Sequence, residues 1–297
     1  MAILLQRLTA MLTSAILGFL PLFGAAAPNV ELNIPFAKAS VFQMMDIAFP
    51  ENCEGITGPV SAVLVVHGGG WIGSRLGHTA EIEDFARRGF VAAAIDHRFF
   101  FGKTGYLEML EDIGLALEEL QRQAQLRGLT IKNAAIAGPS SGGHLATLYA
   151  FKHHADAPID IAFCVGMVPP SDFLDPAWWE GGFARKALIS LVFGLLLNAP
   201  VTEKNIATAY ADAARDASPY AHLDADCPPT IFMFAKQDEI VPFSNALRMR
   251  EKLERLGGQG YEYEFLVFEN SGHNMDKDPD IWQQYGVLFE AFAEKYM

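Results

Sequence analysis

Continuous apolar runs alternate with amphipathic stretches along most of this chain. The runs are short and end in glycine, proline or polar clusters, which is typical of strands buried on both faces of a parallel sheet. The amphipathic stretches have helical spacing. The predicted strands are 41–49, 60–66, 90–95, 131–137, 159–166, 230–235 and 261–268, and the predicted helices are 79–88, 106–126, 145–150, 244–256 and 280–296. This alternation predicts an α/β fold with a mostly parallel central sheet and helices on both faces.

Two stretches depart from the simple alternation. The first strand, 41–49, ends at Pro50, so we expect it at an edge of the sheet. The stretch 172–217 contains no predicted strand, but it includes Trp178-Trp179 and the apolar run 187–197. That run is shorter than the roughly 20 residues that span a bilayer, so we predict a helical cap insertion above the strand ends. The run is either an ordinary buried helix or a lid that faces substrate or membrane lipid.

Residues 1–27 have the composition of a leader. Arg7 is the one charged residue, the stretch 8–20 is mostly apolar, and three alanines precede Pro28. These features predict a secretory signal peptide and therefore a secreted or periplasmic protein. The alternative is an uncleaved membrane anchor, since 8–27 is long enough to span a bilayer. The remaining residues, 28–297, form the predicted α/β domain.

The composition and net charge of the chain limit the classes of binding partner that we expect. The chain has 297 residues, of which 51% are hydrophobic, and a net charge of −13. The electric field of this negative charge repels a phosphate backbone, so we do not expect nucleic acid as a partner.

Cys53 and Cys227 lie in predicted loops, and they are the pair that could form a disulfide in an oxidising compartment. Cys164 lies in an apolar strand. No cysteine or histidine spacing indicates a metal, and we expect no cofactor.

The segment Gly138-Pro139-Ser140-Ser141-Gly142 lies between a predicted strand and a predicted helix. A strand, a sharp turn and a helix in that order are the context of a G-x-S-x-G nucleophile elbow. A side chain at Gly138 or Gly142 is expected to collide with the neighbouring strand or helix. Ser140 is therefore the predicted nucleophile, although the motif alone is also compatible with a serine- and glycine-rich turn.

A nucleophilic serine needs a base and a carboxylate that orients the base. Asp238 and His273 follow the ends of two successive predicted strands, in the order Ser, Asp, His that the elbow arrangement uses. Consecutive strand ends of a parallel sheet lie on one face, which predicts that both meet Ser140. Glu239 is a rival for the acid and His222 for the base, but His222 breaks the order.

Attack by a serine on a carbonyl group creates a negatively charged oxygen, and hydrogen-bond donors are needed to stabilise this oxyanion. The backbone N–H of Ser141 is one candidate, and the glycine run His67-Gly68-Gly69-Gly70 supplies others at Gly69 and Gly70. We expect His67 to brace this loop, and Trp71 either to line the acyl site or to pack the loop.

Taken together, these motifs resemble the α/β-hydrolase superfamily, and within it the hormone-sensitive-lipase-like esterases and the bacterial feruloyl and acetyl esterases. The resemblance spans roughly residues 41–297. It rests on 67–71, Asp96-His97-Arg98, 138–146, Ala217-Ser218-Pro219, Asp238 with Val241-Pro242, and Gly272-His273. It implies Ser140, Asp238 and His273 as nucleophile, acid and base, and Gly69 and Gly70 as oxyanion glycines. His97 stands where the family usually has tyrosine, and 99–102 replaces a proline-rich segment.

The expected function is that of a serine carboxylic-ester hydrolase that acts on a small-molecule ester through an acyl-enzyme. Two alternatives remain open from the sequence. One is an amide hydrolase, such as an arylformamidase, that uses the same three residues. The other is a binding protein that has the hydrolase fold without catalysis. A lid built from 187–197 would add lipid or membrane contact to the list of partners.

Overall fold

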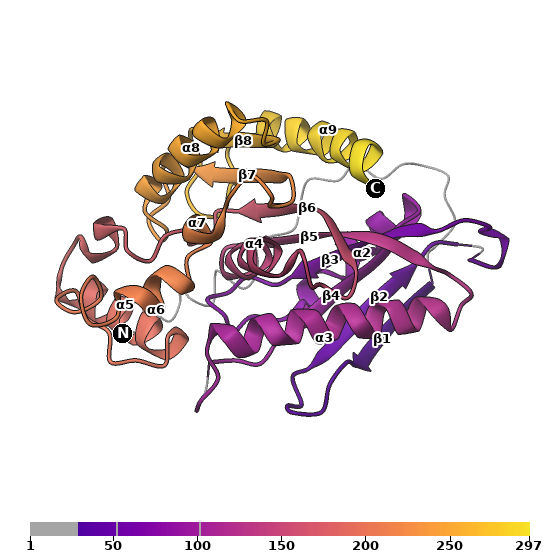
Figure 1. Cartoon of the computed structure of the whole chain (residues 1–297), viewed down its shortest axis with the longest axis horizontal. Helices are drawn as coiled ribbons and strands as arrows, with labels where there is room; N and C mark the ends of the chain where they lie inside the picture. Colours follow the sequence, from indigo (N-terminus) through magenta and orange to yellow (C-terminus); the bar gives the residue numbers. More distant parts are fainter. Residues whose placement is uncertain (1–28, 52, 101) are drawn as a thin grey trace.

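The computed structural model describes residues 29–51, 53–100 and 102–297 (Figure 1). Within them, eight strands form one sheet in the order β1-β2-β4-β3-β5-β6-β7-β8. Their bounds are β1 Asn29–Pro35, β2 Met44–Phe49, β3 Val60–Val66, β4 Val91–Asp96, β5 Ile131–Pro139, β6 Asp160–Met167, β7 Thr230–Ala235 and β8 Tyr263–Phe268. Strand β2 pairs antiparallel with β1 and β4, and the other pairs are parallel. The predicted α/β architecture is confirmed.

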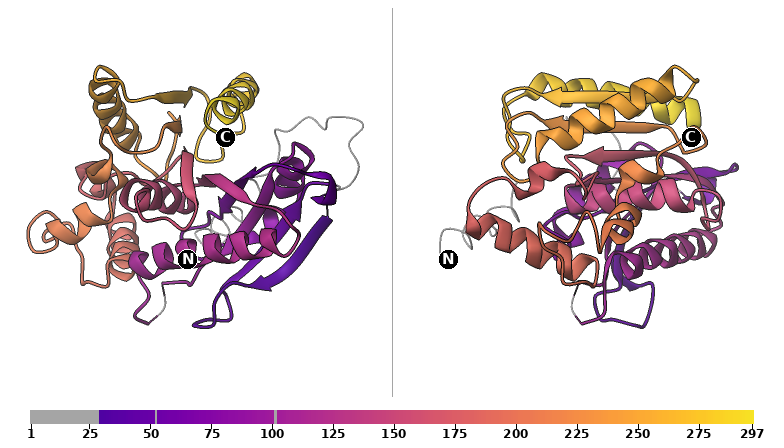
Figure 2. Two further views of the ribbon diagram at one scale, coloured as in Figure 1. Left: turned by 45° about the vertical axis from the view of Figure 1, so that its right-hand side comes forward. Right: turned by 60° about the vertical axis from the view of Figure 1, so that its left-hand side comes forward.

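Helices cover both faces of the sheet (Figure 2). One face packs against α3 (Tyr106–Gln125), α4 (Ser141–His153) and α8 (Phe243–Gly257), and the other against α2 (Thr79–Arg87) and α9 (Pro279–Tyr296). Strand β3 shows why both faces need cover. Leu64 and Val66 belong to the first apolar layer, whereas Val63 and Val65 belong to the second. Successive side chains of a strand point to opposite faces, so an unbroken apolar run forms two cores.

The edge of the sheet differs from the prediction. The predicted edge strand lies one position inside the sheet as β2, and the true edge is β1, which the sequence pattern did not predict. Strand β1 is irregular, because its register with β2 shifts between Glu31 and Ile34, and Asn33 has a φ of 59°. A bulge of this kind breaks the alternation of apolar and polar residues by which a strand is recognised.

Residues 172–217, here called the cap segment, connect β6 to the helix that precedes β7. They contain a 3-10 helix (Pro176–Trp179), α5 (Phe183–Leu196) and α6 (Ala211–Asp216), and the short α7 (Pro219–His222) follows. Figure 1 shows α5 and α6 beyond the carboxyl ends of β6 and β7. Helix α5 buries Phe193 and Leu196 but exposes Phe183 and Leu191. It is therefore only partly an ordinary core helix.

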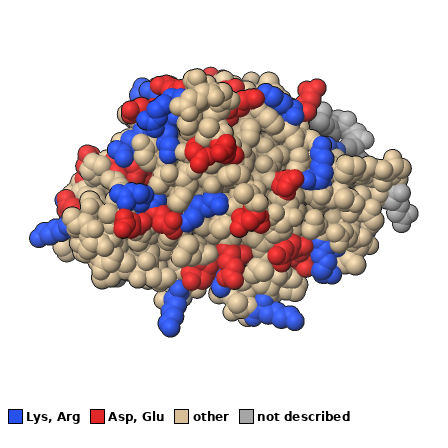
Figure 3. All heavy atoms as spheres, in the orientation of Figure 1, with Lys and Arg blue, Asp and Glu red and all other residues tan. Residues whose placement is uncertain are grey.

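The predicted leader, 1–27, lies outside the described residues. Among the helices of the described part, none is both long and apolar enough to cross a membrane. On the face drawn in Figure 3, basic side chains are interspersed with acidic ones instead of forming one continuous patch. That face offers no basic surface of the kind that a phosphate backbone binds.

Candidate active site

The order of the strands fixes where a site can form. Strands β3 and β5 are neighbours, although β4 lies between them in sequence on the far side of β3. The chain therefore reverses its winding direction between β4 and β5, and sheets of this kind bind ligands at the carboxyl ends of the strands on either side of the reversal, here β3 and β5. The loop after β3 carries the glycine run from Gly68, and the turn after β5 carries Ser140. Two predicted parts of the site thus meet at the switch point of the sheet.

The turn between β5 and α4 has the strained form expected of a nucleophile elbow. Ser140 has φ 53° and ψ −121°. This conformation is strained for any residue other than glycine and therefore costs free energy. A Cβ at Gly142 would overlap the carbonyl oxygen of Val66, and a Cβ at Gly138 would lie 2.5 Å from the same oxygen. The predicted collisions at both glycines are confirmed, and they show how closely the elbow packs against the end of β3.

Three of the predicted side chains form a continuous hydrogen-bonded chain. The Ser140 hydroxyl lies 2.9 Å from Nε2 of His273, and Nδ1 of His273 lies 2.7 Å from Oδ2 of Asp238. With neutral His273, Nδ1–H donates to Asp238 and Nε2 accepts from Ser140. The side chains of Asp238 and His273 are only 3% and 10% exposed, so little water competes for these bonds. This is the arrangement in which a base can take a hydroxyl proton while a carboxylate holds its tautomer.

The glycine loop packs directly on the elbow. A Cβ at Gly68 would lie 2.8 Å from the carbonyl oxygen of Pro139. Gly69, Gly70 and Trp71 all have positive φ, of 87°, 65° and 64°. A Cβ at Gly70 would meet nothing within 4 Å, so the loop is open on that side. Glycine adopts positive φ at low cost, which explains why glycine suits positions 69 and 70.

Ser141 begins α4, where a helix leaves its first N–H groups without an intrahelical acceptor. The positive end of the helix dipole therefore lies beside Ser140. The Ser141 hydroxyl itself is buried and has no hydrogen-bond partner among the described residues. The backbone N–H of Ser141 lies at this positive end of the helix.

Trp71 is buried and serves to pack the loop. Its indole N–H donates to Nδ1 of His144 at 3.1 Å, and Nε2–H of His144 donates to the carbonyl oxygen of Ala217 at 2.8 Å. An indole can only donate and a carbonyl can only accept, so these bonds fix the tautomer of His144. These two hydrogen bonds connect the glycine loop to the helix after Ser140 and to the end of the cap segment. The place of His144 on the helix after the elbow predicts a structural or solvated side chain, and the structure shows the structural role.

Two further buried histidines support the site. The rings of His67 and His97 stack with centroids 4.4 Å apart, and Nδ1 of His67 bonds the carbonyl oxygen of Gly68 at 2.8 Å. Burial lowers the pKa of His67 to about 3, and the adjacent His97 adds to the shift. Burial likewise lowers the pKa of His97 to about 4 and that of His144 to about 4. These rings are neutral polar supports, which agrees with the bracing role predicted for His67.

Neither rival residue is part of the hydrogen-bonded chain from Ser140. His222 bonds the backbone of Asp216, and the Glu239 carboxylate lies beside Gly272 without replacing Asp238. The cysteine pairing is not formed, since Cys53 and Cys227 are both free. The Cys53 thiol instead donates to the Pro50 carbonyl at 2.9 Å. Among the described residues, no group of histidine, cysteine, aspartate and glutamate has an arrangement that could hold a metal ion.

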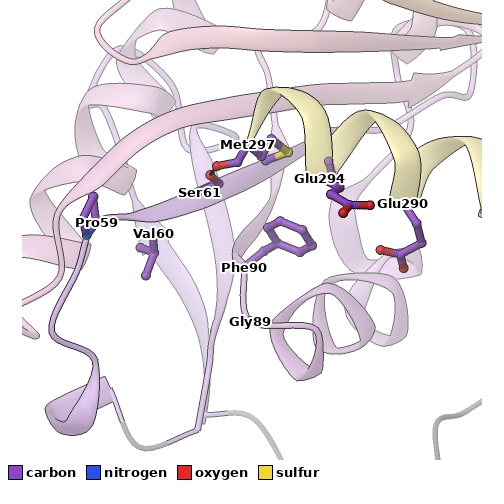
Figure 4. Close-up of a pocket in the computed structure, with 9 residues that line it drawn as sticks. Pro59, Val60, Ser61, Gly89, Phe90, Glu290, Glu294 and Met297 are labelled. Atoms are coloured by element: carbon purple, nitrogen blue, oxygen red, sulfur yellow. Dashed lines mark hydrogen bonds between the residues drawn. The ribbon is translucent and has the colours of Figure 1, made fainter.

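One cavity lies well away from Ser140. It has a volume of about 420 Å³ and is lined by residues at the amino-terminal ends of β3 and β4 and by α9, including Val60, Phe90 and Glu294 (Figure 4). The Ser61 hydroxyl donates to the carbonyl oxygen of Met297 beside it, at 3.0 Å. Because the carboxyl ends of the strands hold the site, this cavity belongs to the opposite end of the sheet.

The sequence profile of the BD-FAE family matches residues 45–253, which is more than half of the chain. The chain belongs to the BD-FAE family. The matched range includes the elbow and Asp238 of this BD-FAE protein and ends before His273.

Curated relatives are similar to this chain over part of their length. The probable carboxylic ester hydrolase LipM of Mycobacterium tuberculosis is 26% identical over 220 residues, which are 72% of this BD-FAE chain and 49% of LipM. Esterase LipC of the same organism is 25% identical over 231 residues, which are 74% of this chain and 54% of LipC. The chain thus spans about half the length of these curated relatives.

The fold is also that of solved esterases. The thermophilic esterase Est2 of Thermogutta terrifontis superposes with a TM-score of 0.63 at 22% identity, over 89% of this chain and 91% of Est2. At this identity the likeness concerns the fold, which is the α/β-hydrolase fold predicted from the sequence.

The buried histidines predict a stability that falls in acid. Their pKa values in the folded protein lie below the ordinary value of about 6.5, so the unfolded chain binds protons more readily. Their contribution is complete above about pH 6.5 and declines as pH falls toward 4, by up to about 1.4 kcal/mol per pH unit for each ring. Urea unfolding at about pH 7, 6 and 5 measures this slope. His97→Phe should flatten it, whereas His153→Gln, at a half-exposed site on α4, should not. An unchanged slope in His97→Phe would contradict the assignment.

Proposed function

We propose that this protein is a serine carboxylic-ester hydrolase that acts on small-molecule esters through an acyl-enzyme. The observation that carries the proposal is the continuous chain from the Ser140 hydroxyl through His273 to the buried Asp238. The strained backbone of Ser140 and the names of the relatives LipM and LipC support the same reading.

In the proposed reaction, Nε2 of His273 takes the proton of Ser140 as Oγ attacks the ester carbonyl carbon. Asp238 stabilises the imidazolium that forms, without accepting its proton. His273 then gives that proton to the leaving alkoxide, which departs as the alcohol and leaves the acyl group on Ser140. A water molecule, deprotonated by His273, attacks the acyl carbon, and the carboxylic acid leaves as the proton returns to Ser140.

The proposed oxyanion hole consists of the backbone N–H groups of Gly69, Gly70 and Ser141. The support is geometric. The glycine loop packs on Pro139 beside Ser140, and Ser141 begins a helix whose positive end faces the same place. Removing one donor of this kind costs about 2.7–4 kcal/mol in a comparable serine hydrolase.

The nucleophile assignment predicts that Ser140→Ala loses hydrolysis of a short p-nitrophenyl ester while keeping its thermal unfolding temperature. The alanine removes the attacking atom and leaves the buried surroundings in place. Ser141→Ala is the matched control, and it should stay active because its hydroxyl has no partner among the described residues. Full activity of Ser140→Ala would contradict the proposal. A wild-type protein that cleaves a matched anilide faster than the ester would point to the amide hydrolase instead.

We also propose that the cap segment favours lipophilic acyl groups or a lipid interface. Phe183 and Leu191 are 88% and 58% exposed, and Ala187 between them is exposed as well. Residues four positions apart lie on one side of a helix, so these three form an apolar stripe along α5. Stripes of this kind on an outer helix favour contact with apolar partners.

If the stripe contacts apolar substrates, the double variant Phe183→Ser with Leu191→Ser should have a weaker preference for long acyl chains. Detergent micelles should also activate it less than they activate the wild type. Rates on p-nitrophenyl esters of increasing chain length, with and without detergent, measure both effects. Short-chain hydrolysis serves as the internal control and should persist. A double variant with an unaltered chain-length profile and unaltered activation by micelles would rule out the stripe as a substrate surface.

We further propose that the protein is exported, on the basis of the leader composition of residues 1–27. N-terminal sequencing of the protein from its native cells should find a mature end near residue 28. An intact Met1 on the mature protein would favour the membrane-anchor alternative.

A further inference from the structure

A guanidinium of the cap segment contacts the loop that carries Asp238. Arg185, in the first turn of α5, donates from Nη1 to the carbonyl oxygen of Glu239 at 2.8 Å and from Nη2 to that of Ile240 at 3.4 Å. In the part of the chain that the structure describes, no carboxylate lies within ion-pair distance of Arg185. A cation is thus directed at two successive backbone carbonyls.

The backbone before α5 is shaped around this side chain. Gly181 has a φ of +102°, and a Cβ at this position would lie 3.1 Å from Cδ of Arg185. The stem of Arg185 therefore folds back over a glycine in a conformation that other residues rarely adopt.

The same two peptide groups face Asp238 on their other side. The N–H of Ile240 donates to Oδ1 of Asp238 at 2.8 Å, and the N–H of Val241 donates to the same oxygen at 3.0 Å. Each peptide group therefore accepts from Arg185 at its oxygen and donates to Asp238 at its nitrogen. The other carboxylate oxygen of Asp238 accepts from His273.

Hydrogen bonds in series polarise one another, and a cation at the carbonyl end of a peptide makes its N–H a stronger donor. The fork of Arg185 also fixes the planes of both peptides, which fixes the direction of the two N–H groups. We infer that Arg185 is a positioning residue that aligns Asp238 with His273 through the Glu239–Ile240 and Ile240–Val241 peptides. This inference rests on the proposed esterase function.

Beside this contact lies a cleft of about 550 Å³, which Gly181 and Arg185 line from the cap segment and Asp238, Glu239 and Pro242 line from the loop. The hydrogen bonds of Arg185 therefore lie next to an opening to solvent. Loss of the guanidinium would leave both carbonyl oxygens without this donor, so that the two N–H groups bonded to Asp238 would be held less firmly.

The test compares Arg185→Gln with Lys186→Gln. The control removes the same charge from the neighbouring residue, which pairs with Glu203 on the surface. We expect Arg185→Gln to lower kcat and kcat/KM together by about 10-fold, less than the roughly 10²-fold that a 1 Å misplacement can cost. Its KM and unfolding temperature should match those of Lys186→Gln. The far-downfield proton resonance of the Asp238–His273 hydrogen bond should shift or broaden in Arg185→Gln alone.

Arg185→Lys keeps the charge but not the fork, so its kcat should fall between those of the wild type and Arg185→Gln. The inference is overturned if Arg185→Gln is as fast as the control, or if the lysine variant is no faster than the glutamine variant. If Arg185→Gln does not fold, the lysine variant decides, and a wild-type kcat there overturns the inference. An inactive wild-type protein would instead refute the proposed function, which separates the two failures.

Discussion

The site depends on the close approach of two backbones at the carboxyl ends of β3 and β5. Gly142 lies against the carbonyl oxygen of Val66, and Gly68 lies against that of Pro139. Side chains at these positions would force the glycine loop and the elbow apart, and Ser140 would then lose its place beside the loop. The strand order places the two loops side by side, and the glycines allow their backbones to come into contact. The backbone strain at Ser140 is offset by the packing of the whole sheet around it.

Buried polar groups then hold each part of the site in one state. His144 connects Trp71 to Ala217, and His67 stacks on His97, all as neutral rings. Asp238 is different, because it is a carboxylate that accepts from two backbone N–H groups and from His273. The neutral rings stabilise the loops without placing charge near the reacting atoms, so that Asp238 and His273 are the pair suited to handle a proton. On this account the site separates structural from chemical histidines by burial and by partner.

The sequence predicted the parts of this protein that depend on local pattern. Strands β3 and β7 are largely apolar runs, and polar residues directly follow the last residue of each strand. The sequence therefore predicts where both strands end. Ser140, Asp238 and His273 could be proposed because each follows a strand and because their order is informative. Strand β1 escaped prediction because its bulge breaks the alternation.

The contacts of Trp71 and Arg185 escaped prediction for a different reason. Trp71 bonds a residue 73 positions away, and Arg185 bonds carbonyls 54 and 55 positions away. Nothing in a single sequence reports which distant backbone groups a side chain will meet. Such pairings follow from how the cap segment is placed over the strand ends, which only the folded chain determines.

The account is tested most directly by labelling the protein with a fluorophosphonate and locating the adduct by peptide mass spectrometry. It predicts a single phosphonylated serine at Ser140 in the wild type, and strongly reduced labelling in His273→Gln because the serine has lost its base. Labelling at another serine, or equal labelling of Ser140 without His273, would contradict it.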